Sequence, residues 1–411
     1  MDGLHSFMSS AATARSGAGI HEAASPEGAL ERARRVAVKL RAGTRRIEEQ
    51  RELPPDLLEA MHEARLFRLL LPKSLGGDEI DLPTFVQVTE TIAAADASAA
   101  WCLGQGSGCS MTASFLKPDI AQRLFGPRNA VLAWGAGVQG TAIAVDGGYR
   151  VSGQWSFASG SRHATMLGAH CKIVEADGQA RMNAAGKQAD CTALFSRAKA
   201  KVRDVWDVMG LRGTGSDTYE VADLFVAADE TLDRESLDKV VVKSALYRLP
   251  TTIIYAGGFG GVMLGVVRGT LGDLRTLALA KTQRGASSSM RESQVFQSDL
   301  AKMEARYRAA RALLHMTVSE VWNDVNAGKA LTLDHRINVR LAATHAINEG
   351  VDIVAEAYRA AGSSAIFREF PFEQRLRDAH SVSQQVQGRP THYMTVGRHL
   401  LDLPPDSMMF I

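Results

Sequence analysis

The feature that most constrains the fold is a hydrophobic period that changes twice along the 411 residues. Residues 27–128 carry apolar side chains at helical spacing, residues 129–237 form short runs rich in β-branched and aromatic residues, and residues 238–411 return to the helical period. Because strands and helices are segregated rather than alternating, this order argues against a parallel βαβ sheet. The sequence predicts an α+β protein with an N-terminal helical domain, a central antiparallel β domain and a C-terminal four-helix bundle.

Composition excludes several classes of partner. The formal net charge is +2 and charged residues make up 22% of the chain, which gives no basic surface for nucleic acid or an anionic membrane. No stretch reaches the roughly 20 apolar residues that span a bilayer. Residues 1–26, rich in Ala, Ser and Gly, contain no continuous apolar core, so we expect a flexible arm rather than a secretory signal. A cytoplasmic protein is the prediction.

Further helices are predicted on both sides of the β domain. Residues 84–116 are predicted to form two small-residue helices, which are too apolar on every side for a surface position and are therefore expected to be interior. In the C-terminal domain, helices are also predicted over about residues 334–360 and 371–400.

Local patterns predict individual contacts. The Asp146-Gly147 pair lies between two strand-like runs and predicts a hairpin turn. The glycines of residues 250–267 predict a helix that packs closely against a neighbour, within the chain or in another subunit. One long apolar face is predicted for the helix over residues 294–322, formed by Phe296, Leu300, Met303, Tyr307, Ala310, Leu314 and Val321.

Several catalytic and cofactor-binding motifs are absent, or occur in a part of the sequence that does not support their usual structure. Gly135–Gly140 matches GxGxxG but leads into a strand instead of a helix, so it does not predict a dinucleotide fold. Its glycines serve either a close approach of backbone to a ligand or a turn. The histidines are scattered and predict no metal site. The cysteines form no CxxC pair or disulfide framework and are expected to be buried, reduced thiols: Cys102, Cys109, Cys171 and Cys191.

Three longer stretches carry a resemblance to a known family. They are residues 148–160 (GYRVSGQWSFASG), residues 209–226 (MGLRGTGSDTYEVADLFV) and residues 361–379 (AGSSAIFREFPFEQRLRDA). With the α–β–α order, they resemble the acyl-CoA dehydrogenase family over residues 27–400. The first stretch is similar to the branch of two-component flavin-dependent monooxygenases. That resemblance implies reduced flavin (FMNH2 or FADH2), O2, a separate NAD(P)H-dependent flavin reductase and a homotetramer.

The departures from the family indicate which reaction to expect. Acyl-CoA dehydrogenases need a carboxylate base, and Val386 stands where the resemblance places it. No Asp or Glu occurs in residues 381–393. The monooxygenase branch often has two histidines, and here Gln385 and Cys109 occupy those positions. A glutamine donates a hydrogen bond but is no base near neutral pH, so the sequence favours oxygenation over dehydrogenation.

The resemblance also implies site residues. Backbone and side chains near Ser159 are expected to hold the isoalloxazine ring: Trp134, Gly135, Ala136, Gly137, Phe157, Ala158 and Ser159. Ser159, Gln385 and Cys109 are the candidate catalytic positions, and Arg284 is the candidate phosphate contact. Each has an ordinary alternative: Ser159 can close a turn, Gln385 can be a solvated helix residue, and Arg284 can be an exposed loop arginine.

The leading hypothesis is therefore a flavin-dependent monooxygenase. It would use reduced flavin from a separate reductase, and a flavin C4a-hydroperoxide would oxygenate a small aromatic or heteroatom-bearing substrate. Two alternatives stay open at this point. One is an acyl-CoA dehydrogenase or oxidase whose base lies elsewhere, and the other is a non-catalytic homologue.

Overall fold

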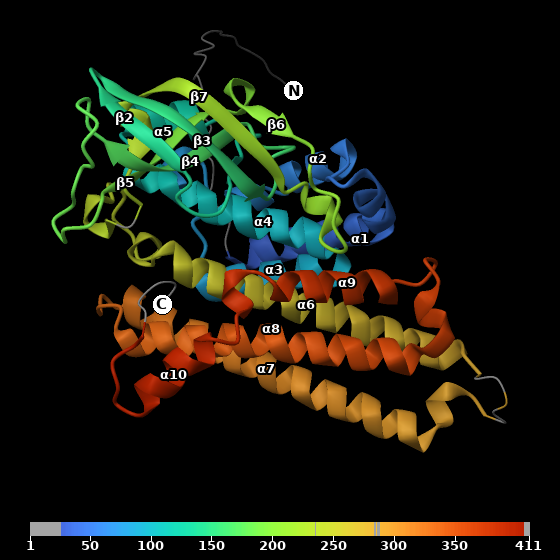
Figure 1. Cartoon of the computed structure of the whole chain (residues 1–411). Coiled ribbons are helices and arrows are strands. Elements are labelled where there is room, and N and C mark those ends of the chain that lie inside the picture. Colours follow the sequence, from blue (N-terminus) through green and yellow to red (C-terminus); the bar gives the residue numbers. More distant parts are fainter. Residues whose placement is uncertain (1–25, 235, 283–284, 286–287, 407–411) are drawn as a thin grey trace, which may run out of the picture.

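The computed structural model describes residues 26–234, 236–282, 285 and 288–406. Residues 1–25 of the predicted N-terminal arm lie outside the described residues. Figure 1 shows three layers, with the sheet on one side, the N-terminal helices in the middle and the long C-terminal helices on the other side. The predicted α+β order, helical, then sheet, then helical, is confirmed.

Two of the N-terminal helices, α3 (Leu82–Ala95) and α4 (Ala97–Ser110), begin at an aspartate that caps the helix. The Asp81 carboxylate accepts a hydrogen bond from Thr84 N at 2.7 Å, and Asp96 accepts one from Ala99 N at 2.8 Å. The helix that follows Asp96 is buried on almost every side, which confirms its predicted interior position. The helices are α1 (Pro26–Gln50), α2 (Pro55–Glu63), α3 (Leu82–Ala95), α4 (Ala97–Ser110) and α5 (Pro118–Phe125).

The central sheet is mixed rather than wholly antiparallel. Five of the seven strand pairings in the described chain are antiparallel, whereas β4 pairs in parallel with both β1 and β2. The cause is the β2–β3 hairpin, because β3 runs back along β2 and β4 then returns on the other side of β2. The strands are β1 (Leu132–Trp134), β2 (Gly140–Val145), β3 (Gly148–Ala158), β4 (Met166–Val174), β5 (Asp190–Ser196), β6 (Lys201–Arg203), β7 (Asp217–Ala227) and β8 (Thr231–Leu232).

The predicted hairpin turn is confirmed. Val145 pairs with Gly148, so Asp146 and Gly147 form a two-residue turn, and Gly147 has a φ of 74°.

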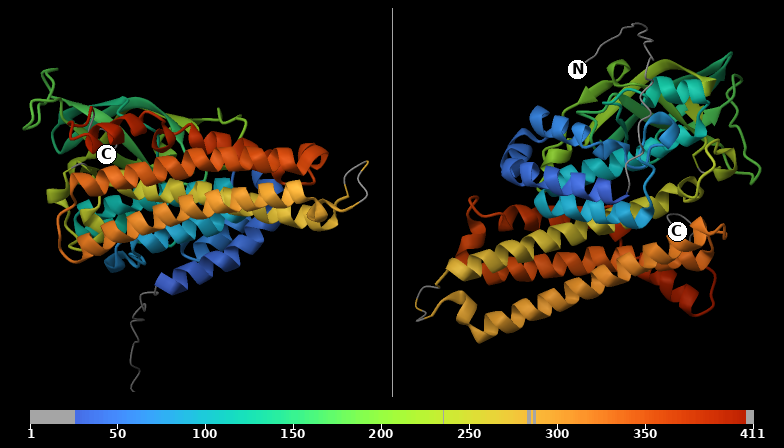
Figure 2. Two further views of the ribbon diagram at one scale, coloured as in Figure 1. Left: turned by 90° about the horizontal axis from the view of Figure 1, so that it is seen from below. Right: turned by 180° about the vertical axis from the view of Figure 1, so that it is seen from behind.

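The C-terminal helices are α6 (Thr251–Ala280), α7 (Gln294–Asn326), α8 (Leu333–Ala361), α9 (Phe372–Ser383) and α10 (His392–Leu400). The three long helices, α6, α7 and α8, run side by side in both views of Figure 2. The apolar face predicted for α7 is confirmed, since every member is buried except the half-buried Leu300.

One helix was predicted over residues 371–400, and that prediction is wrong in one respect. The chain breaks after α9 into a short 3₁₀ turn, η11 (Val386–Gly388), before α10. Side chains of α8 satisfy the freed carbonyls, because Thr344 Oγ1 donates to the Gln387 carbonyl at 3.1 Å and Asn348 Nδ2 donates to the Gly388 carbonyl at 3.0 Å. Pro390 also lacks the N–H that a continuous helix needs.

Helix α6 is the core helix of the protein. A Cβ atom at Gly261 would lie 2.5 Å from Thr89 Oγ1, so the glycine lets α6 approach α3 closely, as predicted. In contrast to the sequence expectation, α6 is long and apolar enough to cross a membrane, but 83% of its most apolar window is buried inside the protein. Burial of this kind is what a core helix requires.

The hydrophobic clusters show where the layers meet. One large cluster joins the N-terminal and C-terminal helices, a second fills the sheet, and a third packs α4 and α5 against β1 and β4. The predicted limits at residues 128 and 237 lie outside the strands and the numbered α-helices. As domain boundaries they stay predictions.

Candidate active site

The predicted site residue Ser159 lies at the junction of the sheet and the helical layer. Trp101 on α4 donates a hydrogen bond from its indole Nε1 to Ser159 Oγ at 3.0 Å. Both residues are buried, with 9% of Trp101 and 8% of Ser159 exposed. Since Ser159 follows β3 directly, this bond fixes the end of a strand against α4.

The Ser159 hydroxyl is the end of a row of buried hydroxyl groups. Ser159 Oγ lies 2.8 Å from Ser216 Oγ, and Ser216 Oγ lies 2.7 Å from Thr214 Oγ1. Thr214 Oγ1 in turn donates to the Leu211 carbonyl at 2.8 Å. Ser159 is therefore part of a network rather than an isolated turn hydroxyl.

The predicted loop at the end of β1 packs directly against β3. Ala136 N donates to the Ser156 carbonyl at 3.0 Å, and Gly135 N donates to Tyr219 Oη at 3.2 Å. A Cβ atom at Gly135 would lie 2.6 Å from the Ser156 carbonyl oxygen, so only glycine fits there. Gly137 has a φ of 75°, a conformation that glycine adopts without strain.

Phe157 has a conformation that is unusual for its residue type. Its φ is 61° and 64% of its side chain is exposed, although it is large and apolar. Its ring meets the ring of Trp206 edge-on, with centroids 6.0 Å apart. A bulky residue held in the left-handed region costs about 1–3 kcal/mol, and such strain is concentrated at ligand sites.

Aromatic rings from α4 and α6 stack beneath Ser159. The ring centroids of Trp101 and Phe259 are 4.0 Å apart with an interplanar angle of 16°, and those of Phe259 and Tyr255 are 5.5 Å apart at 5°. The predicted residue Cys109 ends this stack, with its Sγ 3.7 Å from Tyr255 Oη. Burial raises the pKa of the Cys109 thiol to about 12, so it stays neutral near pH 7.

Trp134 borders the same region. Its ring lies 5.0 Å from the imidazole of His170, edge-on, and the Arg234 guanidinium lies 5.5 Å from its centroid. Burial holds the pKa of His170 well below its usual range, so that imidazole stays neutral.

Gln385 is not a solvated helix residue, because it precedes η11. Its Oε1 accepts a hydrogen bond from Gln387 N at 2.8 Å. This contact orients the amide and leaves Nε2 as the donor group. That Nε2 atom is buried and has no partner among the described residues. Buried donors are almost always paired, so this atom is a candidate contact for a ligand. Val386 follows it and offers no carboxylate.

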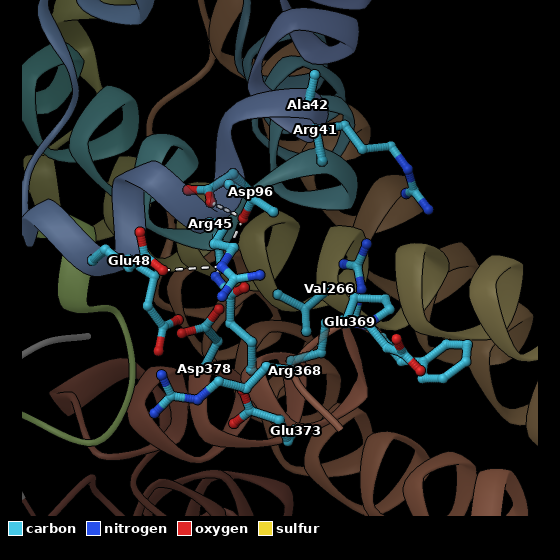
Figure 3. Close-up of a pocket in the computed structure, with 18 residues that line it drawn as sticks. Arg41, Ala42, Arg45, Glu48, Asp96, Val266, Arg368, Glu369, Glu373 and Asp378 are labelled. Atoms are coloured by element: carbon cyan, nitrogen blue, oxygen red, sulfur yellow. Dashed lines mark hydrogen bonds and ion pairs between the residues drawn. The ribbon is translucent and has the colours of Figure 1, made fainter. Parts of the chain in front are cut away.

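A separate polar pocket of about 330 Å³ lies between α1 and α9 (Figure 3). Figure 3 shows Glu48, Asp96 and Asp378 on one side of it. Among the predicted site residues that the structure describes, none lines this pocket or the larger one, of about 710 Å³, beside β5. Asp378 nevertheless connects the first pocket to the hydroxyl row, because its Oδ1 accepts a hydrogen bond from Leu211 N at 2.7 Å.

The contacts thus join most of the predicted residues and omit two. Hydrogen bonds and ring contacts connect the 134–137 loop, residues 156–159 and Cys109. No contact in the described chain links Gln385 to them, and Arg284 lies outside the described residues. Ser216 and Thr214 were not among the predicted site residues, although both fall in the 209–226 stretch that carries the resemblance.

Comparison with protein families supports the fold at both ends of the chain. The family "Acyl-CoA dehydrogenase, N-terminal domain" matches residues 29–125, and "Acyl-CoA dehydrogenase, C-terminal domain" matches residues 257–388. Among solved structures, the HsaA monooxygenase from M. tuberculosis has a TM-score of 0.85 at 22% identity, covering 93% of this chain and 99% of that chain. The chain belongs to the acyl-CoA dehydrogenase family.

Several similar curated proteins are named as monooxygenases or hydroxylases. Indole-3-acetate monooxygenase of Pseudomonas putida is 28% identical over 360 residues, which cover 88% of this chain and 90% of the relative. The oxygenase component of the FADH(2)-dependent resorcinol hydroxylase of Rhizobium sp. is 24% identical, covering 90% and 93%. A dibenzothiophene monooxygenase from Paenibacillus sp., solved with FMN and indole, has a TM-score of 0.78 at 22% identity, covering 92% of this chain and 98% of that chain.

Proposed function

We propose that the protein is the oxygenase component of a two-component flavin-dependent monooxygenase. It binds reduced flavin made by a separate NAD(P)H-dependent reductase and uses O2 to transfer one oxygen atom to a small aromatic or heteroatom-bearing substrate. The relatives named as oxygenase components or subunits support this function. When bound, the flavin supplies the electrons and the oxygen chemistry.

One observation carries the proposal. Ser159 Oγ and Gln385 Nε2 are buried hydrogen-bonding groups, whereas residues 381–393 contain no carboxylate. An acyl-CoA dehydrogenase needs a base to remove a proton from its substrate. Hydrogen bonds and exclusion of water are what an oxygenating flavin needs from its protein.

The residues around Ser159 fit an isoalloxazine ring. The glycine-containing loop of residues 134–137 brings backbone amides close to β3, and Phe157 offers an exposed aromatic face in a strained conformation. In this proposal these residues and Ala158 hold the ring, Ser159 and Gln385 contact its polar edge, and Arg284 contacts a phosphate. The neutral thiol of Cys109 lines the site.

The aromatic stack supports the substrate class. Trp101, Phe259 and Tyr255 form a nearly parallel series of rings below Ser159. Offset stacking of a further flat ring on such a surface contributes about 0.5–1.5 kcal/mol beyond its buried area. A planar aromatic substrate therefore matches this wall.

The decisive experiment uses the purified protein and chemically reduced flavin. Anaerobic titration with FMNH2 and FADH2 is expected to show binding of at least one, and mixing with oxygen and an aromatic substrate is expected to give a product 16 mass units heavier. If the protein binds neither reduced flavin, the proposed function is wrong and the protein is a non-catalytic homologue. Loss of the absorbance of bound oxidised flavin on anaerobic mixing with an acyl-CoA would indicate a dehydrogenase instead.

Assembly as a homotetramer and a cytoplasmic location are part of the proposal. Large apolar side chains gather at the end of α10, where 71% of Leu400 and 73% of Leu401 are exposed. Such patches mark association surfaces. Light scattering at micromolar concentration is expected to give about four times the 44.3 kDa chain mass, and a monomer would contradict it.

A further inference from the structure

The loop between β6 and β7 connects α9 to the candidate active site. On the α9 side, Leu211 N donates to Asp378 Oδ1 at 2.7 Å, and the Arg377 guanidinium donates to the Met209 carbonyl. A Cβ atom at Gly210 would lie 2.2 Å from the Arg377 carbonyl oxygen, so loop and helix are in direct contact. The loop cannot move without breaking these contacts.

Leu211 is held in the left-handed region with a φ of 53°. A leucine there is strained by about 1–3 kcal/mol. Four hydrogen bonds offset the strain. Leu211 N donates to Asp378, and the Leu211 carbonyl accepts from Thr214 N at 3.2 Å, from Thr214 Oγ1 at 2.8 Å and from Trp206 Nε1 at 3.0 Å. Leu211 therefore couples Asp378 to the hydroxyl row.

Hydrogen counting fixes the direction of that row. Thr214 gives its only hydroxyl hydrogen to the Leu211 carbonyl, which can only accept. Thr214 must then accept from Ser216, and Ser216 must accept from Ser159. Ser159 thus donates its only hydroxyl hydrogen to Ser216 and accepts a hydrogen bond from Trp101 Nε1. One lone pair remains, so the Ser159 hydroxyl can only accept a hydrogen bond from a ligand.

We propose that Asp378 is a positioning residue that, through Leu211 and Thr214, fixes Ser159 as a hydrogen-bond acceptor and thereby makes the site prefer reduced over oxidised flavin. The inference rests on the proposed function. Reduced flavin carries an N–H at N5 that an acceptor can bind, whereas N5 of oxidised flavin is itself an acceptor. An acceptor at Ser159 therefore discriminates between the two states.

The carboxyl of Asp378 is set apart from others by its surroundings. Only 4% of it is exposed, it borders the pocket of Figure 3, and burial together with nearby Asp96 and Glu48 raises its pKa to about 7. Arg377 and the Leu211 N–H act in the opposite direction, and the neighbouring Arg375 is engaged by Asp273. The ionised carboxylate is the stronger acceptor for the Leu211 N–H.

The test compares the dissociation constants of reduced and oxidised flavin in purified variants. Thr214→Val frees the Ser216 hydroxyl and allows Ser159 to donate, so we expect reduced flavin to bind roughly tenfold more weakly while oxidised flavin binds as before or more tightly. Thr317→Val is the matched control, because Thr317 is a buried threonine that donates to the Leu313 carbonyl in α7, away from the site.

Two Asp378 variants complete the experiment. Asp378→Ala is expected to lose the preference as Thr214→Val does. Asp378→Asn keeps an acceptor for Leu211 N, so it should retain the preference. The wild type is expected to bind reduced flavin more tightly as the pH rises through about 7, and D378N is expected to lose this tightening. If the wild type binds reduced flavin and Thr214→Val leaves the ratio of the two constants unchanged, this inference is wrong and the proposed function stands. If the wild type binds no reduced flavin, the proposed function itself fails.

Discussion

Trp101 and Ser159, 58 positions apart in the sequence, are joined by a buried hydrogen bond of 3.0 Å from the indole Nε1 to the hydroxyl oxygen. This bond connects α4 to the end of β3. Trp101 is the first ring of the aromatic stack, and Ser159 is the last residue of the hydroxyl row. The candidate site is therefore built across two layers of the fold rather than within one motif.

Replacing Ser159 with alanine is expected to destabilise the protein. The Trp101 indole N–H would be left buried without an acceptor, which costs about 1–3 kcal/mol. Urea unfolding of the variant measures this loss. Ser114→Ala is the control, because Ser114 is also buried but its hydroxyl donates only to the Met111 carbonyl of its own turn. Equal stability of S159A and the wild type would contradict the predicted bond.

Gln385→Glu should separate binding from chemistry. The new carboxylate still accepts from Gln387 N but has lost the buried donor at Nε2. We expect reduced flavin to bind within about threefold of the wild type and product per flavin oxidised to fall roughly tenfold or more. The exposed neighbour allows a control, Gln384→Glu, which should leave both quantities unchanged. If Q385E forms as much product per flavin oxidised as the wild type, Gln385 is not part of the site.

The cysteines are predicted to be inert in the folded protein. Cys102, Cys109, Cys171 and Cys191 are all buried, and burial raises the pKa of the Cys109 thiol to about 12. A colorimetric thiol reagent at pH 8 should label none of them before unfolding and four in guanidinium chloride. Cys109→Ala should leave the pH dependence of flavin oxidation unchanged, whereas a displaced profile would show that the thiol exchanges a proton.

Asp378→Asn is expected to gain stability relative to the wild type as the pH rises. The folded pKa of Asp378, about 7, lies above its unfolded value of about 4. The favourable contribution of the protonated carboxyl is therefore complete below pH 4 and is lost between pH 4 and 7. Thermal unfolding at pH 5 and pH 8 should show the difference in unfolding free energy widening by roughly 2–3 kcal/mol in favour of D378N. A constant difference would mean that Asp378 titrates normally.

Phe259→Leu should weaken binding of a flat ring while keeping the core filled. The substitution removes the centre of the stack between Trp101 and Tyr255. With indole as the probe, calorimetry in the presence of flavin is expected to show affinity reduced about threefold to tenfold. Leu274→Met, a buried change further along α6, is the control. Unchanged indole affinity in F259L would place the substrate elsewhere.

The sequence by itself determined the order of the layers. The hydrophobic period marks helices and strands because burial of one face is a local property of each segment, so the α7 face, the Asp146-Gly147 hairpin and the interior α4 could all be predicted. The absence of Asp and Glu from residues 381–393 can likewise be seen in the sequence alone. The break after Ser383 was missed, because side chains of α8 capture the carbonyls there.

Only the tertiary structure decided how the site is connected. Nothing local joins Trp101 to Ser159, or Asp378 to Leu211, because these bonds form only when α4, α9 and the β6–β7 loop pack together. The direction of the hydroxyl row follows from a carbonyl that becomes its terminal acceptor in three dimensions. Sequence patterns record which side chains are buried, whereas the partner of a buried polar group is chosen by packing, since an unpaired group costs free energy wherever it lies.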